Sequence, residues 1–240
     1  MAKSSSRNSG ARRLGVKVRT AKGRKTSSMY WLQRQLNDPY VAKAQAEGYR
    51  SRAAFKLAQI DDKHKFLKSG ARIVDLGAAP GGWSQVAAHR VKTQAGTGQV
   101  IAVDIASMEP LAGVTSLQLD FTDPQTGDQI INELRGGQAD AVISDMAAPA
   151  TGHKKTDHLR IIGLCEAALD FAEEVLAPEG VFLAKVLQGG TERELLERLK
   201  RQFAQVRHIK PEASRSDSAE VYVLATGFQG KEKKAREASE

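Results

Sequence analysis

The chain has 240 residues, of which 41% are hydrophobic and 27% are charged, and its formal net charge is +8. This length and composition predict one soluble domain with tails, and no run approaches the roughly 18 apolar residues of a membrane-spanning helix. Cys165 is the only cysteine, which excludes an internal disulfide and any multi-cysteine zinc or redox motif. We therefore expect a cytoplasmic protein that does not associate with membranes and that is a monomer.

The basic charge is concentrated at the N-terminus. Residues 1–25 contain nine lysines and arginines and no acidic residue, so the rest of the chain has a net charge of −1. A segment this rich in serine, glycine and charge cannot bury enough apolar surface to fold alone. We expect a disordered basic arm over residues 1–28, which either keeps the protein soluble or neutralises phosphates of a nucleic acid. Residues 29–228 would form the folded domain and residues 229–240 a charged C-terminal tail.

A basic helix is predicted over residues 50–60, and strands and helices alternate after it. On this helix Lys56 lies at the edge of the apolar face. Short apolar runs bounded by turn residues predict strands. Several of the segments that separate these strands have a helical pattern. The strands are expected at 72–77, 99–105, 116–121, 140–146, 180–186, 205–210 and 220–228, and the helices at 82–92, 124–135, 157–176 and 190–203.

This order of elements predicts the fold class. Strands that alternate with helices form a parallel sheet with helices on both faces. The last two strands have no helix between them, which predicts an antiparallel strand near one edge. We therefore expect an α/β protein with a doubly wound, mostly parallel seven-stranded sheet of the Rossmann-like kind.

A glycine-rich loop, DLGAAPGGW, follows the first predicted strand at residues 75–83. In such sheets the ligand lies at the carboxyl ends of the strands. Asp104 ends the second predicted strand, 22 residues beyond Gly82, where a carboxylate can bind the hydroxyls of a ribose. Asp120 ends the third predicted strand. Together with Asp75, these carboxylates predict a bound nucleoside with a free 2′-hydroxyl.

Four further residues indicate chemistry at the same edge. Lys185 falls inside the apolar run GVFLAKV, where a lone buried lysine is unfavourable unless it is paired. Asp145 ends the fourth predicted strand, Glu220 opens the last one, and Lys56 lies on the basic helix. The sheet could bring these two amines and two carboxylates to one cleft. The alternative is a pair of salt bridges that only holds the rim of the sheet together.

Five blocks of the sequence occur in the order typical of one enzyme family. They are YRSRAAFKL, DLGAAPGGWSQ, VISDMAAP, FLAKVLQG and SRSDSAEVYVLATGF, within a region from about Tyr30 to Phe228. In these blocks the chain resembles the FtsJ/RrmJ-like ribose 2′-O-methyltransferases. The N-terminal arm departs from the pattern, because it is longer and more basic than the family core requires.

The resemblance implies a cofactor, a site and a partner. The cofactor is S-adenosyl-L-methionine, and RNA is the substrate, specifically a uridine of 23S ribosomal RNA in the large ribosomal subunit. The family's Lys–Asp–Lys–Glu tetrad corresponds to Lys56, Asp145, Lys185 and Glu220. The resemblance also implies cofactor contacts, which correspond to Gly81, Trp83, Asp104, Asp120 and Asp145. Trp83 fits a packing role equally well.

The chemistry of methyl transfer suggests a role for each member of the tetrad. We assign Lys185 as the base that accepts the proton of the hydroxyl, and Asp145 as the group that orients it. Lys56 and Glu220 would support the pair and position the substrate. Lys56 lowers the pKa of Lys185 and the two carboxylates raise it, so the direction of the shift is open at this stage.

Three alternatives remain open. A nicotinamide-dependent oxidoreductase would share the nucleoside site, but the chain lacks a GxGxxG motif and a Tyr-x-x-x-Lys pair. A non-catalytic RNA-binding factor of ribosome assembly would keep the fold without the chemistry. A methyltransferase acting on transfer RNA or a messenger RNA cap would differ only in substrate. We expect no metal site, since Asp157, between His153 and His158, fits a helix N-cap better.

Overall fold

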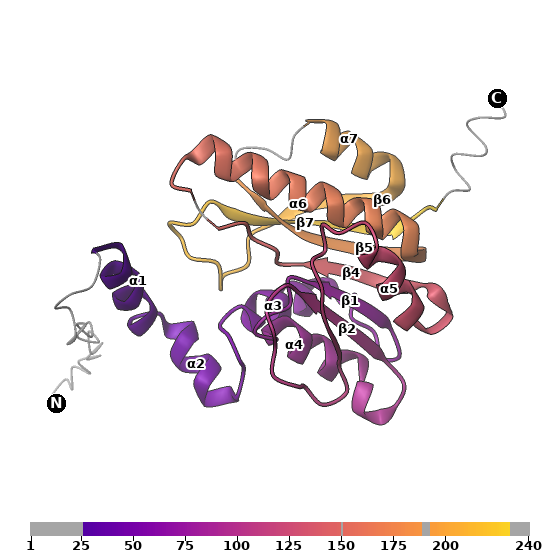
Figure 1. Ribbon diagram of the computed structural model, residues 1–240, viewed down its shortest axis with the longest axis horizontal. Helices are drawn as coiled ribbons and strands as arrows, with labels where there is room; N and C mark the ends of the chain where they lie inside the picture. Colours follow the sequence, from indigo (N-terminus) through magenta and orange to yellow (C-terminus); the bar gives the residue numbers. More distant parts are fainter. Residues whose placement is uncertain (1–25, 150, 189–192, 231–240) are drawn as a thin grey trace, which may run out of the picture.

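The computed structural model describes residues 26–149, 151–188 and 193–230 (Figure 1). Residues 1–25 of the expected arm and residues 231–240 of the expected tail lie outside this part of the chain. Helix α1 (Thr26–Leu36) begins inside the segment expected to be the arm. None of the described helices is long and apolar enough to cross a membrane.

The described strands form one seven-stranded sheet with the order β3-β2-β1-β4-β5-β7-β6. Their bounds are β1 Arg72–Leu76, β2 Gln99–Asp104, β3 Thr115–Gln118, β4 Ala139–Ser144, β5 Leu176–Leu187, β6 Phe203–Ile209 and β7 Glu220–Phe228. Strands β1 to β5 pair in parallel, and β7 runs antiparallel to both β5 and β6. The expected doubly wound, mostly parallel sheet with an antiparallel strand near one edge is confirmed.

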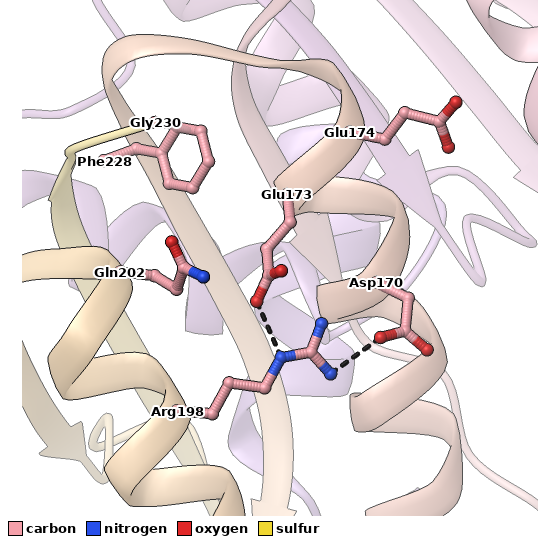
Figure 2. A pocket seen from close by; sticks show the side chains of 7 residues that line it. All are labelled: Asp170, Glu173, Glu174, Arg198, Gln202, Phe228 and Gly230. Carbon is pink, nitrogen blue, oxygen red and sulfur yellow. Dashed lines mark hydrogen bonds and ion pairs between the residues drawn. The ribbon is translucent and has the colours of Figure 1, made fainter. Parts of the chain in front are cut away.

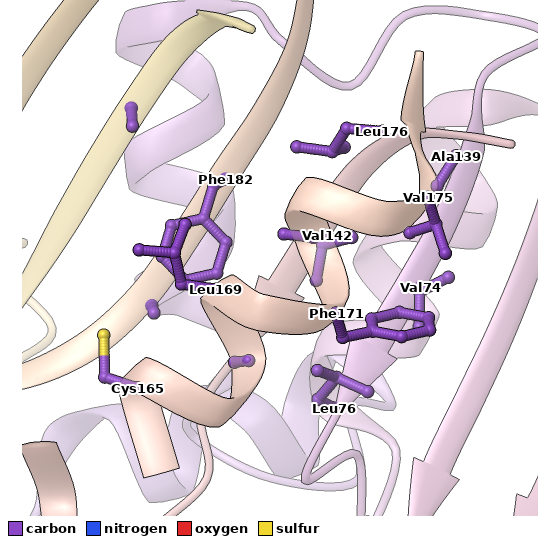
Figure 3. Close-up of a cluster of buried hydrophobic side chains, with 14 of the residues drawn as sticks. Val74, Leu76, Ala139, Val142, Cys165, Leu169, Phe171, Val175, Leu176 and Phe182 are labelled. Atoms are coloured by element: carbon purple, nitrogen blue, oxygen red, sulfur yellow. The ribbon is translucent and has the colours of Figure 1, made fainter. Parts of the chain in front are cut away.

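Helices cover both faces of the sheet, and each face has its own apolar core. On one face lie α3 (Ala54–His64) and α4 (Gly82–Val91), which pack through residues such as Leu57 and Val86. On the other face lie α5 (Thr126–Glu133), α6 (Lys154–Val175) and α7 (Arg193–Gln202). Figure 3 shows the core beneath α6, where Leu169 and Phe182 are fully buried and Cys165 packs as a small apolar residue.

Helix α7 is also joined to α6 by ion pairs (Figure 2). The guanidinium of Arg198 lies 2.6 Å from a carboxylate oxygen of Asp170 and 2.6 Å from one of Glu173. The hydrogen bond to Glu173 is the largest of the effects that raise the pKa of Arg198. These charges compensate one another across a hollow of about 360 Å³ between the two helices. We interpret this hollow as part of the contact between α6 and α7, not as a ligand site.

The sequence pattern assigns no helix before residue 50, and the described residues there form two. After α1 comes α2 (Pro39–Glu47), which Asp38 caps with a side-chain oxygen and which ends at Gly48 in the left-handed conformation. Asp38 also pairs with Arg52 at 2.9 Å and with Arg215 at 3.0 Å. One buried carboxylate thus fastens the N-terminal helices to the loop that precedes β7.

We predict that Leu183→Ala lowers the free energy of unfolding by about 2–5 kcal/mol, because it opens a cavity in a fully packed core. Leu183 has no exposed surface, whereas the side chain of Leu159 is 61% exposed. The same substitution at Leu159 serves as the matched control, with an expected change within about 0.5 kcal/mol. Chemical denaturation of the two variants measures both values, and equal losses would contradict the assignment of the core.

Candidate active site

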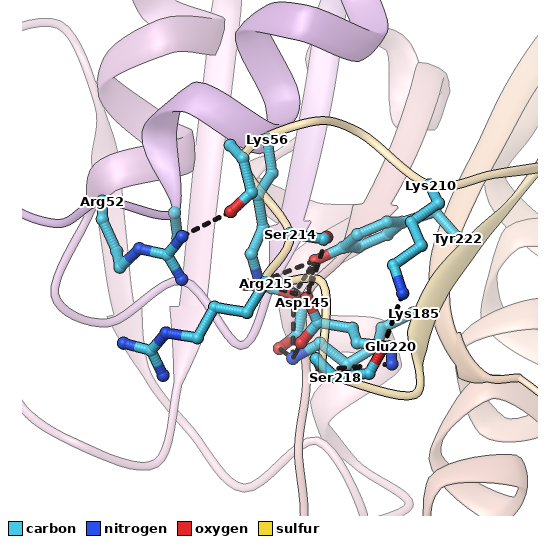
Figure 4. Close-up of polar contacts among 12 residues, drawn as sticks. Arg52, Lys56, Asp145, Lys185, Lys210, Ser214, Arg215, Ser218, Glu220 and Tyr222 are labelled. Carbon is cyan, nitrogen blue, oxygen red and sulfur yellow. Dashed lines mark hydrogen bonds and ion pairs between the residues drawn. The ribbon is translucent and has the colours of Figure 1, made fainter. Parts of the chain in front are cut away.

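Four charged side chains from four elements meet at the carboxyl end of the sheet (Figure 4). Lys56 comes from α3, Asp145 follows β4, Lys185 lies in β5 and Glu220 begins β7. The ammonium nitrogen of Lys185 lies 2.8 Å from Asp145 Oδ1 and 3.5 Å from Glu220 Oε2. Lys56 binds Glu220 Oε1 and lies 3.9 Å from Asp145 Oδ2. The structure brings together all four residues that the sequence analysis singled out.

A fifth residue, Tyr222, lies at the centre of this tetrad and was missed by the sequence analysis. Its hydroxyl donates to Asp145 Oδ1 at 2.7 Å, accepts from Lys56 Nζ at 3.1 Å and lies 3.2 Å from Glu220 Oε1. The signal was available, because residues two apart on a strand share a face and Tyr222 follows Glu220 by two. The register of β5 and β7 also sets Tyr222 opposite Lys185.

The two lysines of the tetrad are buried and the two carboxylates are half-buried. Burial alone lowers the pKa of Lys185, but the carboxylates of Asp145 and Glu220 outweigh it and raise that pKa above its ordinary value. Burial raises the pKa of Glu220, and the two lysines more than reverse this effect, so it is lowered. The direction of the shift, which the sequence left open, is therefore upward and favours the protonated form of Lys185.

Burial, together with the carboxylates of Asp145 and Glu220, raises the pKa of Tyr222 well above its ordinary value. The hydroxyl therefore keeps its proton and remains a donor toward Asp145.

A cleft of about 620 Å³ adjoins the tetrad at the carboxyl ends of β1, β2 and β4. Asp104, Asp120 and Asp145 line it, as the strand-end positions predict. The apolar part of its wall includes Val103, Ile105, Leu119, Phe121, Met146, Leu164 and Ala167. Asp145 therefore belongs both to the cleft and to the tetrad.

The carboxylates of Asp104 and Asp120 are already fixed by neighbouring groups. Asp104 accepts from the N–H groups of Ala79 at 2.9 Å and Ala106 at 2.8 Å, which ties it to two loops of the cleft. Asp120 Oδ1 accepts from the hydroxyl and the N–H of Thr122, and these hydrogen bonds lower the pKa of Asp120. A carboxylate has about four acceptor positions, so each can still accept from a ligand.

Three residues of the glycine-rich loop region do not line the cleft. Asp75 is fully buried and accepts from the hydroxyl of Ser84 at 2.6 Å, and burial raises its pKa to about 7. Trp83 is only 2% exposed and lies under the tetrad, with its ring centroid 5.5 Å from that of Tyr222. Gly81 is buried just before α4. Of the aspartates that end the first three predicted strands, Asp104 and Asp120 line the cleft and Asp75 does not.

The structure explains why the first residue of the loop after β1 is a glycine. Gly77 has φ +74°, and a Cβ on it would lie 2.7 Å from Met146 Cγ and 2.9 Å from Met146 Cα. Only glycine tolerates both this conformation and this approach. The loop can therefore contact the segment that carries Asp145, which brings the cleft and the tetrad together.

The loop before α6 corrects one local expectation. Helix α6 begins at Lys154, with His153 at the N-cap position, so Asp157 lies in its first turn. The Asp157 carboxylate accepts from the N–H groups of Thr151 and Gly152 and closes the preceding loop. Within the described residues, no three histidine, cysteine or acidic side chains gather as they would around a metal ion.

Comparison with known proteins supports the same assignment. The FtsJ-like methyltransferase family matches residues 49–228, which include every element from α3 to β7. The chain belongs to this family. The resemblance noted in the sequence is therefore confirmed, and the protein is a methyltransferase.

The relatives of this FtsJ-like methyltransferase span nearly its whole length. It is 62% identical to the ribosomal RNA large subunit methyltransferase E of Xanthobacter autotrophicus, over 93% of this chain and 88% of the relative. The protein of that name from Parvibaculum lavamentivorans is also 62% identical, over 92% and 90% of the two chains. A crystal structure described as a ribosomal RNA methyltransferase from Plasmodium falciparum superimposes with a TM-score of 0.68 at 30% identity. It covers 76% of this chain and 100% of the other.

Proposed function

We propose that this methyltransferase transfers a methyl group from S-adenosyl-L-methionine to a ribose 2′-hydroxyl of RNA. The proposed target is a uridine of 23S ribosomal RNA in the large ribosomal subunit, and the proposed compartment is the cytoplasm. The observation that carries the proposal is the double position of Asp145 in the cleft and in the tetrad. The names of the most similar relatives support the choice of ribosomal RNA.

The residues of the cleft fit the proposed cofactor. The apolar wall that includes Phe121 suits an adenine ring, and the carboxylates of Asp104 and Asp120 suit the hydroxyl and amino donors of a nucleoside. The bound sulfonium supplies an activated methyl group and leaves as a neutral thioether.

The tetrad has the harder task of removing a proton from the 2′-hydroxyl. We assign this role to Lys185, whose ammonium Asp145 holds at 2.8 Å. Lys56 and Glu220 would complete the charge balance and position the ribose. Because the carboxylates of Asp145 and Glu220 raise the pKa of Lys185, its protonated form is favoured at neutral pH. Lys185 must therefore release its own proton to solvent before it can accept one.

This requirement predicts how the rate depends on pH. If neutral Lys185 is the base, kcat rises about tenfold per pH unit from pH 7 to pH 9, with no plateau in that range. Single-turnover methyl transfer at saturating substrates measures the profile. Lys185→Ala should abolish transfer and keep cofactor affinity within a few fold. Lys185→Arg should be equally inactive, since guanidinium stays protonated. A flat profile would assign Lys185 a cationic role instead of a basic one.

The substrate can be tested directly. We expect the purified protein to methylate ribose 2′-hydroxyls in large ribosomal subunits isolated from cells that lack it, with Lys185→Ala as the inactive control. Mapping of 2′-O-methyl sites in total RNA, with and without the protein, identifies the nucleotide. Methylation confined to transfer RNA would replace the proposed substrate. Absence of transfer to every RNA would favour the non-catalytic alternative.

We predict that Asp104→Ala weakens cofactor binding by about 1–3 kcal/mol, because the ribose hydroxyls of the bound cofactor lose their hydrogen-bond partner. Calorimetry with S-adenosyl-L-methionine measures the affinity, and excess cofactor should restore most of the turnover. Asp123→Ala is the matched control, since Asp123 accepts a main-chain N–H of Gln125 in a similar loop but does not line the cleft. Equal affinity of Asp104→Ala and the wild type would refute the nucleoside assignment.

A further inference from the structure

Arg50 lies at the start of the basic segment before α3, where a contact with nucleic acid is the simplest role for an arginine. Its guanidinium instead binds the protein's own main chain. One nitrogen donates to the carbonyl oxygens of Pro80 at 3.3 Å and Glu109 at 2.6 Å, and the other donates to that of Pro110 at 2.7 Å. Three carbonyls thus share one planar group with several fixed donors.

These carbonyls belong to the two loops at the mouth of the cleft. Pro80 lies in the glycine-rich loop between β1 and α4, whose residues Gly77 and Ala79 line the cleft. Glu109 and Pro110 lie in the long loop between β2 and β3, which begins directly after Asp104. Where this second loop begins, Asp104 accepts a hydrogen bond from one of its N–H groups. Further along the loop, Arg50 binds its carbonyl oxygens.

Arg50 is itself held in position by α4. Its N–H donates to Gln85 Oε1 at 2.8 Å, and Gln85 Nε2 donates back to the carbonyl of Gly48 at 3.0 Å. Close packing adds to this constraint, because a Cβ on Gly81 would lie 3.1 Å from the Arg50 guanidinium and 2.9 Å from Met108 Sδ. The side chain therefore fills the space between the two loops.

We propose that Arg50 is a positioning residue for the cofactor, and that it sets the width of the cleft by clamping the β1–α4 loop to the β2–β3 loop. The inference rests on the proposed use of S-adenosyl-L-methionine. A lysine in its place keeps the positive charge but cannot serve three carbonyls in one plane. The charge and the clamp can therefore be separated by one substitution.

The test compares Arg50→Lys with the wild-type full chain. Calorimetry with S-adenosyl-L-methionine should show a Kd raised about tenfold or more, since hydrogen bonds from a charged donor are lost. The KM for RNA should stay within about twofold, because the charge is retained. Hydrogen exchange of the amides of residues 105–114 should become faster in the variant.

Arg135 provides a matched control at the other end of the sheet. Its N–H also donates to a glutamine oxygen, of Gln99, and its guanidinium also donates to a loop carbonyl, of Thr97. Arg135→Lys should leave the Kd for the cofactor unchanged. A second variant, Gln85→Met, keeps the guanidinium and removes its anchor, and should raise the Kd by a few fold.

The outcomes distinguish this inference from the proposed function. If the wild type itself binds no S-adenosyl-L-methionine, the proposed function is wrong. If the wild type binds it and both Arg50→Lys and Gln85→Met bind it equally well, only the clamp is wrong. A raised KM for RNA with unchanged cofactor affinity would make Arg50 an RNA contact and overturn the inference.

Discussion

Two buried amines and two half-buried carboxylates meet in one site, and four separate segments of the chain must come together to form it. A buried charge without a partner is strongly destabilising, by about 3–5 kcal/mol when one member of a pair is removed. Lys56 and Lys185 are 7% and 9% exposed, and each lies within 4 Å of carboxylate oxygens of both Asp145 and Glu220. The hydroxyl of Tyr222 adds hydrogen bonds that such a network needs for its remaining acceptors.

The same pairing creates a conflict between stability and chemistry. The carboxylates that make a buried lysine tolerable also stabilise its protonated form, which cannot accept a proton. In the proposed reaction the substrate hydroxyl would lie beside these charged groups, and the methyl donor is already activated. In such a reaction alignment contributes much of the acceleration. Rigid elements on both faces of the sheet provide that alignment.

Much of the fold and of the candidate site could be predicted from the sequence, because hydrophobic periodicity and turn residues are local features of a chain. The alternation of strands and helices gave the sheet, and the strand ends gave Asp104, Asp120 and Asp145. Pairing across the sheet is not local, so the central place of Tyr222 depended on the register of β5 and β7. Asp75 is a second example, since the sequence does not show whether an aspartate at the end of a strand faces a cleft or the core. Its burial depends on Ser84 and on the helix packed above it.

The position of β7 at the end of the chain has a consequence for the assembly of the tetrad. Lys56 and Glu220 are 164 positions apart in the chain, and β7 enters the sheet between two strands made before it. Single domains generally fold as units. None of the residues that line the cleft belongs to β7, whereas Glu220, the second carboxylate of the tetrad, does. The cleft is therefore lined by the earlier part of the chain, and the charge balance of the proposed catalytic centre depends on its last strand.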